Sequence, residues 1–179
     1  MDYYGAREMA ESYRTVRKNT IAIAEDIPED KYGFRPAEGT RSVAELLVHI
    51  AVANRFQHRI HAVEKRTSLA GFDFPALIQE LHAEEQKARS KTEIIELLKN
   101  GGESFAGWIE GLPEAFLAEK VEMPAAPAPS FKSRFEMLLS PKEHEMHHRA
   151  QLMLVERMLG IVPHLTRQMQ ARLADSQKK

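Results

Sequence analysis

The sequence predicts an all-α protein that folds as an antiparallel four-helix bundle with one short extra helix. Four long segments carry apolar residues at helical spacing, a Ser-x-x-Glu capping box opens the clearest of them, and no segment shows sustained strand alternation or an internal repeat. The 179 residues suffice for one domain with its own core. We therefore expect residues 1–179 to form a single domain, with a C-terminal tail of about residues 168–179 that is open to disorder.

The first two long helices occupy the N-terminal third of the chain. Apolar residues among charges predict a helix over residues 3–27, which Pro28 ends. Ser42, with Glu45 three residues later, forms the capping box of the second helix, which should run to about residue 65. The segment between them, PEDKYGFRPAEGTR, is rich in turn-forming residues and predicts a loop.

The middle of the chain predicts the short extra helix and the third long one. The short helix runs from Pro75 to about Ala88, and the long helix covers about residues 91–111. Gly101 and Gly102 weaken the middle of the long helix, because glycine has low helix propensity. We expect either a bend or a close packing contact at this pair.

The last long helix follows a Pro/Ala loop at residues 123–130, which is too short and too central to be a domain linker. The helix runs from about residue 131 to 159. Pro141 lies inside it and should kink it or restart it, with Ser140 as the new cap and Glu143 closing a second capping box.

Composition limits the classes of function. The formal net charge is −1 and no block of like charge occurs, so we expect no nucleic-acid partner. We expect no membrane association and a cytoplasmic location, because no apolar run could cross a bilayer and the N-terminus lacks the apolar core of a signal peptide. Cysteine is absent, which fits a reducing compartment and means that any thiol chemistry must use a thiol from outside the chain.

The stretch HEMHH at residues 144–148 matches the metalloprotease pattern H-E-x-x-H. On a helix, His144 and His148 lie about 40° apart, on the face that also carries the apolar residues of this segment. His147 lies about 60° away, toward the rim. On the second helix, His49 shares the apolar stripe and also points inward.

Three inward histidines from two long helices indicate a metal site more than an inert core. Structural zinc sites tend to be closed by four ligands, often with cysteine, whereas three histidines without cysteine leave a position open for water or substrate. No metal-binding role is expected for the other histidines. We expect a solvated helix surface for His58, His61 and His82, and a loop position for His164.

A zinc protease is one interpretation of HEMHH, with Glu145 as its general base. The context disfavours it. Gln151 and Leu154 stand where a metzincin has glycine and histidine, and no glutamate follows Gly160 to serve as the third ligand of a gluzincin. No strand is expected along which a peptide substrate could pair.

Two segments, FRPAEGTRSVAELLVHIA and HEMHHRAQLMLVERMLGIVPHL, resemble the DinB/YfiT-like family (DinB superfamily) of metalloenzymes over roughly residues 8–165. The resemblance implies an up-down-down-up four-helix bundle that is commonly dimeric. It also implies a divalent metal ion, often nickel or zinc, held by His49, His144 and His148. Ala150 stands where the family usually has glycine, a change that removes no ligand.

The resemblance also suggests activities. The leading hypothesis is an enzyme that activates a low-molecular-weight thiol for S-transfer or isomerisation of a small-molecule substrate. The alternatives are a metal-dependent hydrolase, with Glu145 as the candidate base, and a non-enzymatic, stress-related metal-binding or dimerisation module. A homodimer is expected from the family. Glu45, about 40° from His49 on the helix, is a candidate partner for that ligand.

Overall fold

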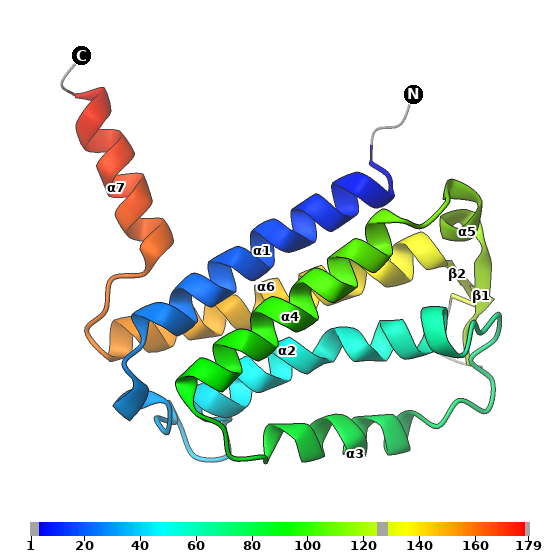
Figure 1. Ribbon diagram of the computed structural model, residues 1–179, viewed down its shortest axis with the longest axis horizontal. Coiled ribbons are helices and arrows are strands. Elements are labelled where there is room, and N and C mark those ends of the chain that lie inside the picture. Colours follow the sequence, from blue (N-terminus) through cyan, green and yellow to red (C-terminus); the bar gives the residue numbers. More distant parts are fainter. Residues whose placement is uncertain (1–3, 125–128, 178–179) are drawn as a thin grey trace.

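Four long helices form the bundle in the computed structural model, which describes residues 4–124 and 129–177. α1 and α6 run in one direction and α2 and α4 in the other, which is the expected up-down-down-up order (Figure 1). α1 packs against α4 and α6, and α2 packs against the same two, so that α1 and α2 lie diagonally across the bundle. The four are α1 (Ala6–Asp26), α2 (Val43–His58), α4 (Lys91–Glu110) and α6 (Arg134–Met158).

Shorter elements connect or extend these helices. α3 is the expected short helix and lies along α2. β1 and β2 form a two-stranded antiparallel ribbon that the sequence did not predict, because three residues are too few for an alternating pattern to be visible. The shorter elements are a 3₁₀-helix (Glu29–Lys31), a π-helix (Arg59–Val63), α3 (Phe74–Glu85), α5 (Glu114–Ala118), β1 (Lys120–Glu122), β2 (Phe131–Ser133) and α7 (His164–Ser176).

Of the two outcomes expected at Pro141, a kink or a restart of the helix, the restart with Ser140 as cap is wrong. α6 is one continuous α-helix with Pro141 inside it, and its cap is Ser133, whose hydroxyl accepts a hydrogen bond from the Glu136 backbone N–H at 3.1 Å. Pro141 is buried. Packing along the rest of α6 outweighs the one backbone hydrogen bond that proline cannot donate.

The chain beyond α6 forms a further helix. Gly160, at φ +77°, ends α6, and the Ile161 N–H donates to the Glu156 carbonyl at 2.8 Å. α7 then leaves the bundle at an angle to it (Figure 1). It covers most of the tail that was expected to be open to disorder, up to Ser176. Of the predicted Pro/Ala loop, residues 125–128 lie outside the described residues.

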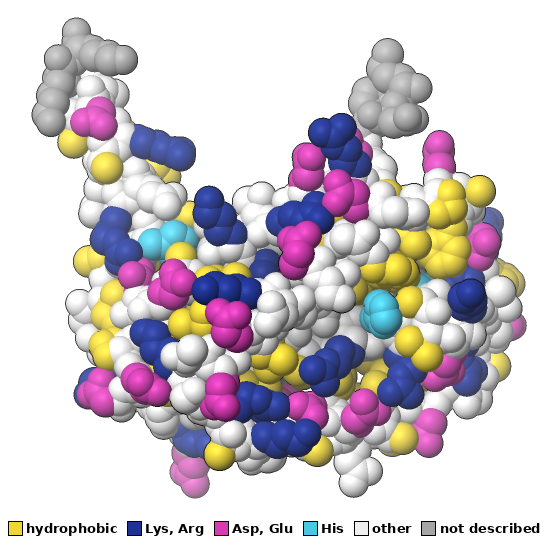
Figure 2. Space-filling model, viewed as in Figure 1, with side chains coloured by type: hydrophobic (Ala, Val, Ile, Leu, Met, Phe, Trp, Pro, Cys, Tyr) yellow, Lys and Arg dark blue, Asp and Glu magenta, His cyan; other side chains and the backbone are white. Residues whose placement is uncertain are grey.

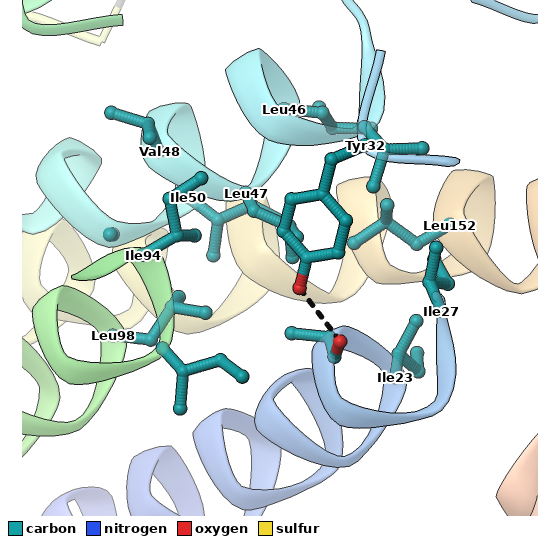
Figure 3. Close-up of a cluster of buried hydrophobic side chains, with 14 of the residues drawn as sticks. Ile23, Ile27, Tyr32, Leu46, Leu47, Val48, Ile50, Ile94, Leu98 and Leu152 are labelled. Carbon is teal, nitrogen blue, oxygen red and sulfur yellow. Dashed lines mark hydrogen bonds between the residues drawn. The ribbon is translucent and has the colours of Figure 1, made fainter. Parts of the chain in front are cut away.

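The largest apolar cluster lies where α1, α2, α4 and α6 meet, and Figure 3 shows its central side chains. Leu47, Leu98 and Leu152 are fully buried in it. Tyr32, from the loop after α1, reaches into the same cluster and its hydroxyl donates to the Ala24 carbonyl at 2.7 Å. The loop is thereby tied to α1 close to the point where α2 begins.

A buried arginine links all four long helices. Arg17 of α1 donates to both carboxylate oxygens of Glu145 on α6, at 2.9 and 3.0 Å. Its remaining donors reach the carbonyl oxygens of Leu98 on α4 and Ile50 on α2. α4 is continuous through its glycine pair. Gly102 leaves room for Arg17, because a Cβ at this position would lie 2.8 Å from the Arg17 Cγ. The glycine pair is therefore the close packing contact that we expected as one of two outcomes.

The surface carries both signs of charge, and Figure 2 shows lysine and arginine interspersed with aspartate and glutamate on the face in view. Within residues 4–124 and 129–177, no helix is long and apolar enough to span a bilayer.

Candidate metal centre

Three histidine side chains meet between α2 and α6. The Nε2 atom of His144 lies 3.1 Å from Nε2 of His49 and 3.2 Å from Nε2 of His148. The potential ligand atoms of the three all lie within 4.8 Å of one another. His144 and His148 are one turn apart on α6, and His49 faces them from α2, so the structure brings together the three residues that helical spacing had turned inward.

Hydrogen bonds fix which nitrogen of two rings carries the proton. His49 Nδ1 lies 2.7 Å from Oε1 of Glu85, and since a carboxylate accepts, Nδ1 carries the hydrogen. His148 Nδ1 lies 2.8 Å from Oε1 of Gln151, which also accepts. The Nε2 lone pairs of both rings therefore point to the space beside His144 Nε2. His144 Nδ1 is buried and has no hydrogen-bond partner within the described part of the chain.

Burial keeps the three rings neutral. Desolvation lowers the pKa of all three histidines, and it lowers that of His144 to about 4, with the neighbouring histidines adding to the effect. Neutral imidazole is the form that binds a metal ion. Zinc–nitrogen bonds at tetrahedral angles place two ligand nitrogens roughly 3.3 Å apart. The two Nε2 separations from His144 and the all-imidazole donor set thus fit a divalent metal ion.

Glu85 is the partner of His49 that sequence reasoning missed. Arg41 Nε donates to its other oxygen at 2.6 Å. Burial alone would raise the pKa of Glu85, but the hydrogen bonds from Arg41 and His49 outweigh it and hold that pKa below its usual value. A signal existed, because Glu85 continues the inward stripe of Leu77 and Leu81 on α3 at a spacing of four. Glu45, the candidate partner that could equally have served only its capping box, pairs with an arginine of the preceding loop and closes that box.

Glu145 lies away from the histidine cluster. It is buried in the bundle interior, and its carboxylate is paired with Arg17. Burial raises the pKa of Glu145, and the attraction of Arg17 opposes that rise. Glu145 lines neither of the cavities that reach the histidines. Its position therefore gives no support to the general-base role that the sequence left open.

Two further histidines differ from expectation. His61 is buried, not solvated, because α2 passes into a π-helix at Arg59, and positions beyond that point no longer follow the 100° spacing. His164 is the first residue of α7, not a loop residue, and it is buried within hydrogen-bond distance of Asn19. His58 is half-buried against Trp108, and His82 is exposed as expected.

Two cavities reach the cluster from different sides. The larger, of about 760 Å³, is lined by His148 together with polar side chains that include Arg35, Arg41 and Gln151. The smaller, of about 230 Å³, is lined by His49 and His144 and is otherwise mainly apolar. Glu85 and His82 line both cavities. Leu46, Leu152 and Val155 also line the larger cavity, so the histidines stand between a cavity of mixed lining and a mainly apolar one.

Comparison with known proteins shows the family and supports the fold. A family model described as the DinB superfamily matches residues 12–152. The uncharacterized protein YjoA of Bacillus subtilis is 24% identical over 155 residues, which cover 87% of this chain and 91% of that protein. The crystal structure of YjoA, a DinB-like protein, is similar with a TM-score of 0.62 and 22% identity, over 86% of this chain and 92% of that one.

A second solved structure, that of YfiT from Bacillus subtilis, is similar with a TM-score of 0.68 and 13% identity, over 90% of this chain and 91% of that one. YfiT is described as a probable metal-dependent hydrolase with an unusual four-helix bundle topology. At this identity the likeness shows the shared fold.

Proposed function

Since the chain belongs to the DinB superfamily, we propose that it is a metal-dependent enzyme acting on a small-molecule substrate, with His49, His144 and His148 as the metal ligands. The convergence of the three Nε2 atoms is the observation that carries this proposal. A divalent cation at this point, nickel or zinc by donor type, would supply Lewis acidity that lowers the pKa of a bound thiol or water.

The protein's own residues prepare the site. Glu85 orients His49 and keeps its Nε2 lone pair free, while Arg41 balances the charge of Glu85. Gln151 does the same for His148 by accepting its Nδ1–H. Such hydrogen bonds to the far side of a ligand fix its tautomer and direction.

The two cavities favour a reaction between two molecules. The larger cavity, which carries charged and amide side chains among apolar walls, suits a low-molecular-weight thiol with several hydrogen-bonding groups, and the smaller, mainly apolar cavity suits an electrophile. With no cysteine in the chain, the thiol has to be supplied by a second molecule. We therefore favour S-transfer to, or thiol-dependent isomerisation of, a small electrophile.

The carboxylates around the cavities also favour a thiol over water. Among the described residues that line either cavity, Glu45 and Glu85 carry the carboxylates, and each is paired with an arginine. Neither is free to take a proton from water. A thiol needs less help, because its ordinary pKa of about 8.5 lies much closer to neutrality than that of water.

Hydrolysis is the second candidate, and the description of YfiT favours it. The same three histidines would serve, and the larger cavity would admit water and substrate together. Glu145 would take no part, because it is paired with Arg17 inside the bundle.

The proposal extends to the protein's assembly and location. A homodimer is implied by the family resemblance, and α6 offers a candidate surface. Met146, Ala150, Leu154 and Met158 repeat every four residues on it and are exposed. A cytoplasmic location accords with the absence of cysteine.

Elemental analysis of the purified protein tests the metal site directly. We expect about one equivalent of nickel or zinc in the wild-type chain and a near-complete loss in His49→Ala, because two histidines hold a divalent ion far more weakly than three. His58→Ala is the matched control, since His58 lies against Trp108 away from the cluster, and it should keep its metal. Equal metal content in all three proteins would refute the site.

A thiol screen with monochlorobimane as the electrophile then separates the two candidate reactions. Under the thiol proposal, the metal-loaded protein accelerates conjugation with at least one small thiol, and His144→Ala and removal of the metal each abolish the acceleration. A metal-loaded protein that conjugates no thiol but hydrolyses a model ester would replace the first candidate by the second.

A further inference from the structure

A chain of three buried side chains leads to the 230 Å³ cavity. Arg134 Nη1 lies 2.8 Å from Nδ1 of His61, and His61 Nε2 lies 3.0 Å from Oε1 of Gln57. All three residues are buried, and Gln57 lines the cavity beside His49 and His144. The chain thus ends at Gln57, in the wall of the space next to the candidate metal ligands.

The direction of each hydrogen bond in this chain is fixed. A guanidinium can only donate, so His61 Nδ1 accepts from Arg134. Burial, together with the charge of Arg134, lowers the pKa of His61 to about 4, so its ring is neutral and carries its one hydrogen on Nε2. That hydrogen is donated to Oε1 of Gln57. The amide of Gln57 is therefore held with its oxygen toward His61 and its NH₂ group on the other side.

The NH₂ group of Gln57 is an unused donor. Within the described residues it has no hydrogen-bond partner, and it is not among the atoms sealed from solvent. Gln57 is 8% exposed, so this donor is open to a water molecule or a ligand, which is how a mostly buried polar group without a protein partner is satisfied.

The rest of the cavity explains what kind of molecule could meet this donor. Its walls are mainly apolar, with Val52, Phe56, Ile78 and Leu81 among them. The polar side chains of the lining are those of His49, Gln57, His82, Glu85, Ser140 and His144. A dry apolar cavity of about 150 Å³ holds benzene, so a volume of about 230 Å³ has room for a six-membered ring with a small substituent.

We propose that Gln57 is a substrate-orienting residue, which donates a hydrogen bond to the acceptor oxygen of a small, mainly apolar carbonyl compound bound in this cavity. The bond holds the oxygen-bearing end of the molecule at the polar part of the wall, while the apolar walls hold its ring. The inference rests on the proposed function in taking this carbonyl compound as the electrophilic substrate. Binding itself does not require a metal.

A matched pair of probes tests the inference. Acetophenone and α-methylstyrene have nearly the same shape, but only acetophenone has an acceptor oxygen. By calorimetric titration, we expect the wild-type protein to bind acetophenone about threefold to tenfold more tightly than α-methylstyrene, the effect of one net hydrogen bond. In Gln57→Met this preference should disappear. Gln79→Met changes an exposed glutamine of α3 that does not line this cavity, and it should keep the wild-type preference.

A second variant distinguishes the loss of the Gln57 donor from a loss of the fold. Gln57→Met removes the acceptor of His61 as well as the donor to the ligand, so its folding is checked by circular dichroism. Gln57→Glu keeps an oxygen for His61 but has no NH₂ group, and it too should lose the preference for acetophenone.

The inference is overturned if the wild-type protein binds neither probe, or if Gln57→Met and Gln57→Glu prefer acetophenone as strongly as the wild type. Metal analysis of the same samples keeps the two proposals separate. A protein without metal that still shows the Gln57-dependent preference supports this inference and contradicts the proposed function. Metal-loaded protein that lacks the preference for acetophenone contradicts this inference and supports the proposed function.

Discussion

At the scale of single residues, Glu85 links the charged side chain of Arg41 to the histidine cluster. It accepts from His49 at 2.7 Å and from Arg41 at 2.6 Å, and it is buried. We expect Glu85→Gln to weaken metal affinity by roughly 10-fold to 100-fold, because the neutral amide orients His49 less firmly and makes it less basic. A competition titration with a chelating dye measures the change.

The control for this change is Glu80→Gln. Glu80 is an exposed carboxylate of the same helix, α3, and pairs with Arg59 outside the site. Its replacement should leave metal affinity within a factor of two or so, since exposed ion pairs contribute little. If both variants bound metal as tightly as the wild type, Glu85 would have no part in holding the ligand.

Glu156 gives a residue-scale prediction for pH. It is fully buried, and neither carboxylate oxygen has a hydrogen-bond partner among the residues described. Burial raises its pKa to about 7 from an ordinary value of 4.5, with the charge of Asp26 adding to the effect. Between these two values the folded state holds a proton that the unfolded state has lost. The contribution of Glu156 to stability is therefore complete below pH 4.5 and is lost as the pH rises through 7.

The variant Glu156→Gln should remove this contribution to the pH dependence. At pH 8 it should be more stable than the wild type by roughly 1 to 3 kcal/mol, because no charge is then buried without a partner. At pH 4.5 the two proteins should differ little. Urea denaturation at both pH values measures the free energies of unfolding, and a stability difference that does not change with pH would contradict the assignment.

At the scale of helices, the contact between α1 and α4 depends on a missing side chain. Gly102 lies against Arg17, whose guanidinium is held by Glu145 and by backbone carbonyls of two other helices. Arg17 therefore cannot move away from an added methyl group at low cost. We expect Gly102→Ala to lower the free energy of unfolding by roughly 1 to 3 kcal/mol, as overpacking of a buried contact does.

Gly107, one and a half turns further along α4, is the matched control. A Cβ there would meet no heavy atom within 4 Å, and the position is exposed. Gly107→Ala should raise stability by about 0.5 to 1 kcal/mol through its better helix propensity. Thermal melts of both variants would contradict this account if the two substitutions shifted Tm in the same direction.

At the scale of the whole molecule, the proposed homodimer predicts a mass. One chain weighs 20.4 kDa, so light scattering should give about twice that value. Met158 on the apolar stripe of α6 is 51% exposed, and Met158→Lys should shift the protein toward the monomer by placing a charge in the contact. Val63→Lys, which changes an exposed residue outside that stripe, should leave the mass unchanged. A wild-type mass of one chain would rule out the dimer.

The sequence alone determined the helical architecture and the three histidines. Helical spacing depends only on local backbone geometry, so the inward direction of His49, His144 and His148 could be read from the positions of apolar residues around them. The same reasoning placed Glu45 in its capping box, because both partners lie within one turn. The family resemblance joined two segments almost a hundred residues apart.

Only the tertiary structure decided which residues complete the site. Glu85 reaches His49 across 36 positions in the sequence, and Arg17 reaches Glu145 across 128. Such pairs depend on how α3 and α1 pack, which no local pattern specifies. His61 is the clearest example, because regular helical spacing placed it on the surface. A π-helical turn instead directs it into the bundle, where it donates a hydrogen bond to Gln57. Local spacing fixes the direction of a side chain along a regular helix, whereas its partner is fixed by the packing of the whole chain.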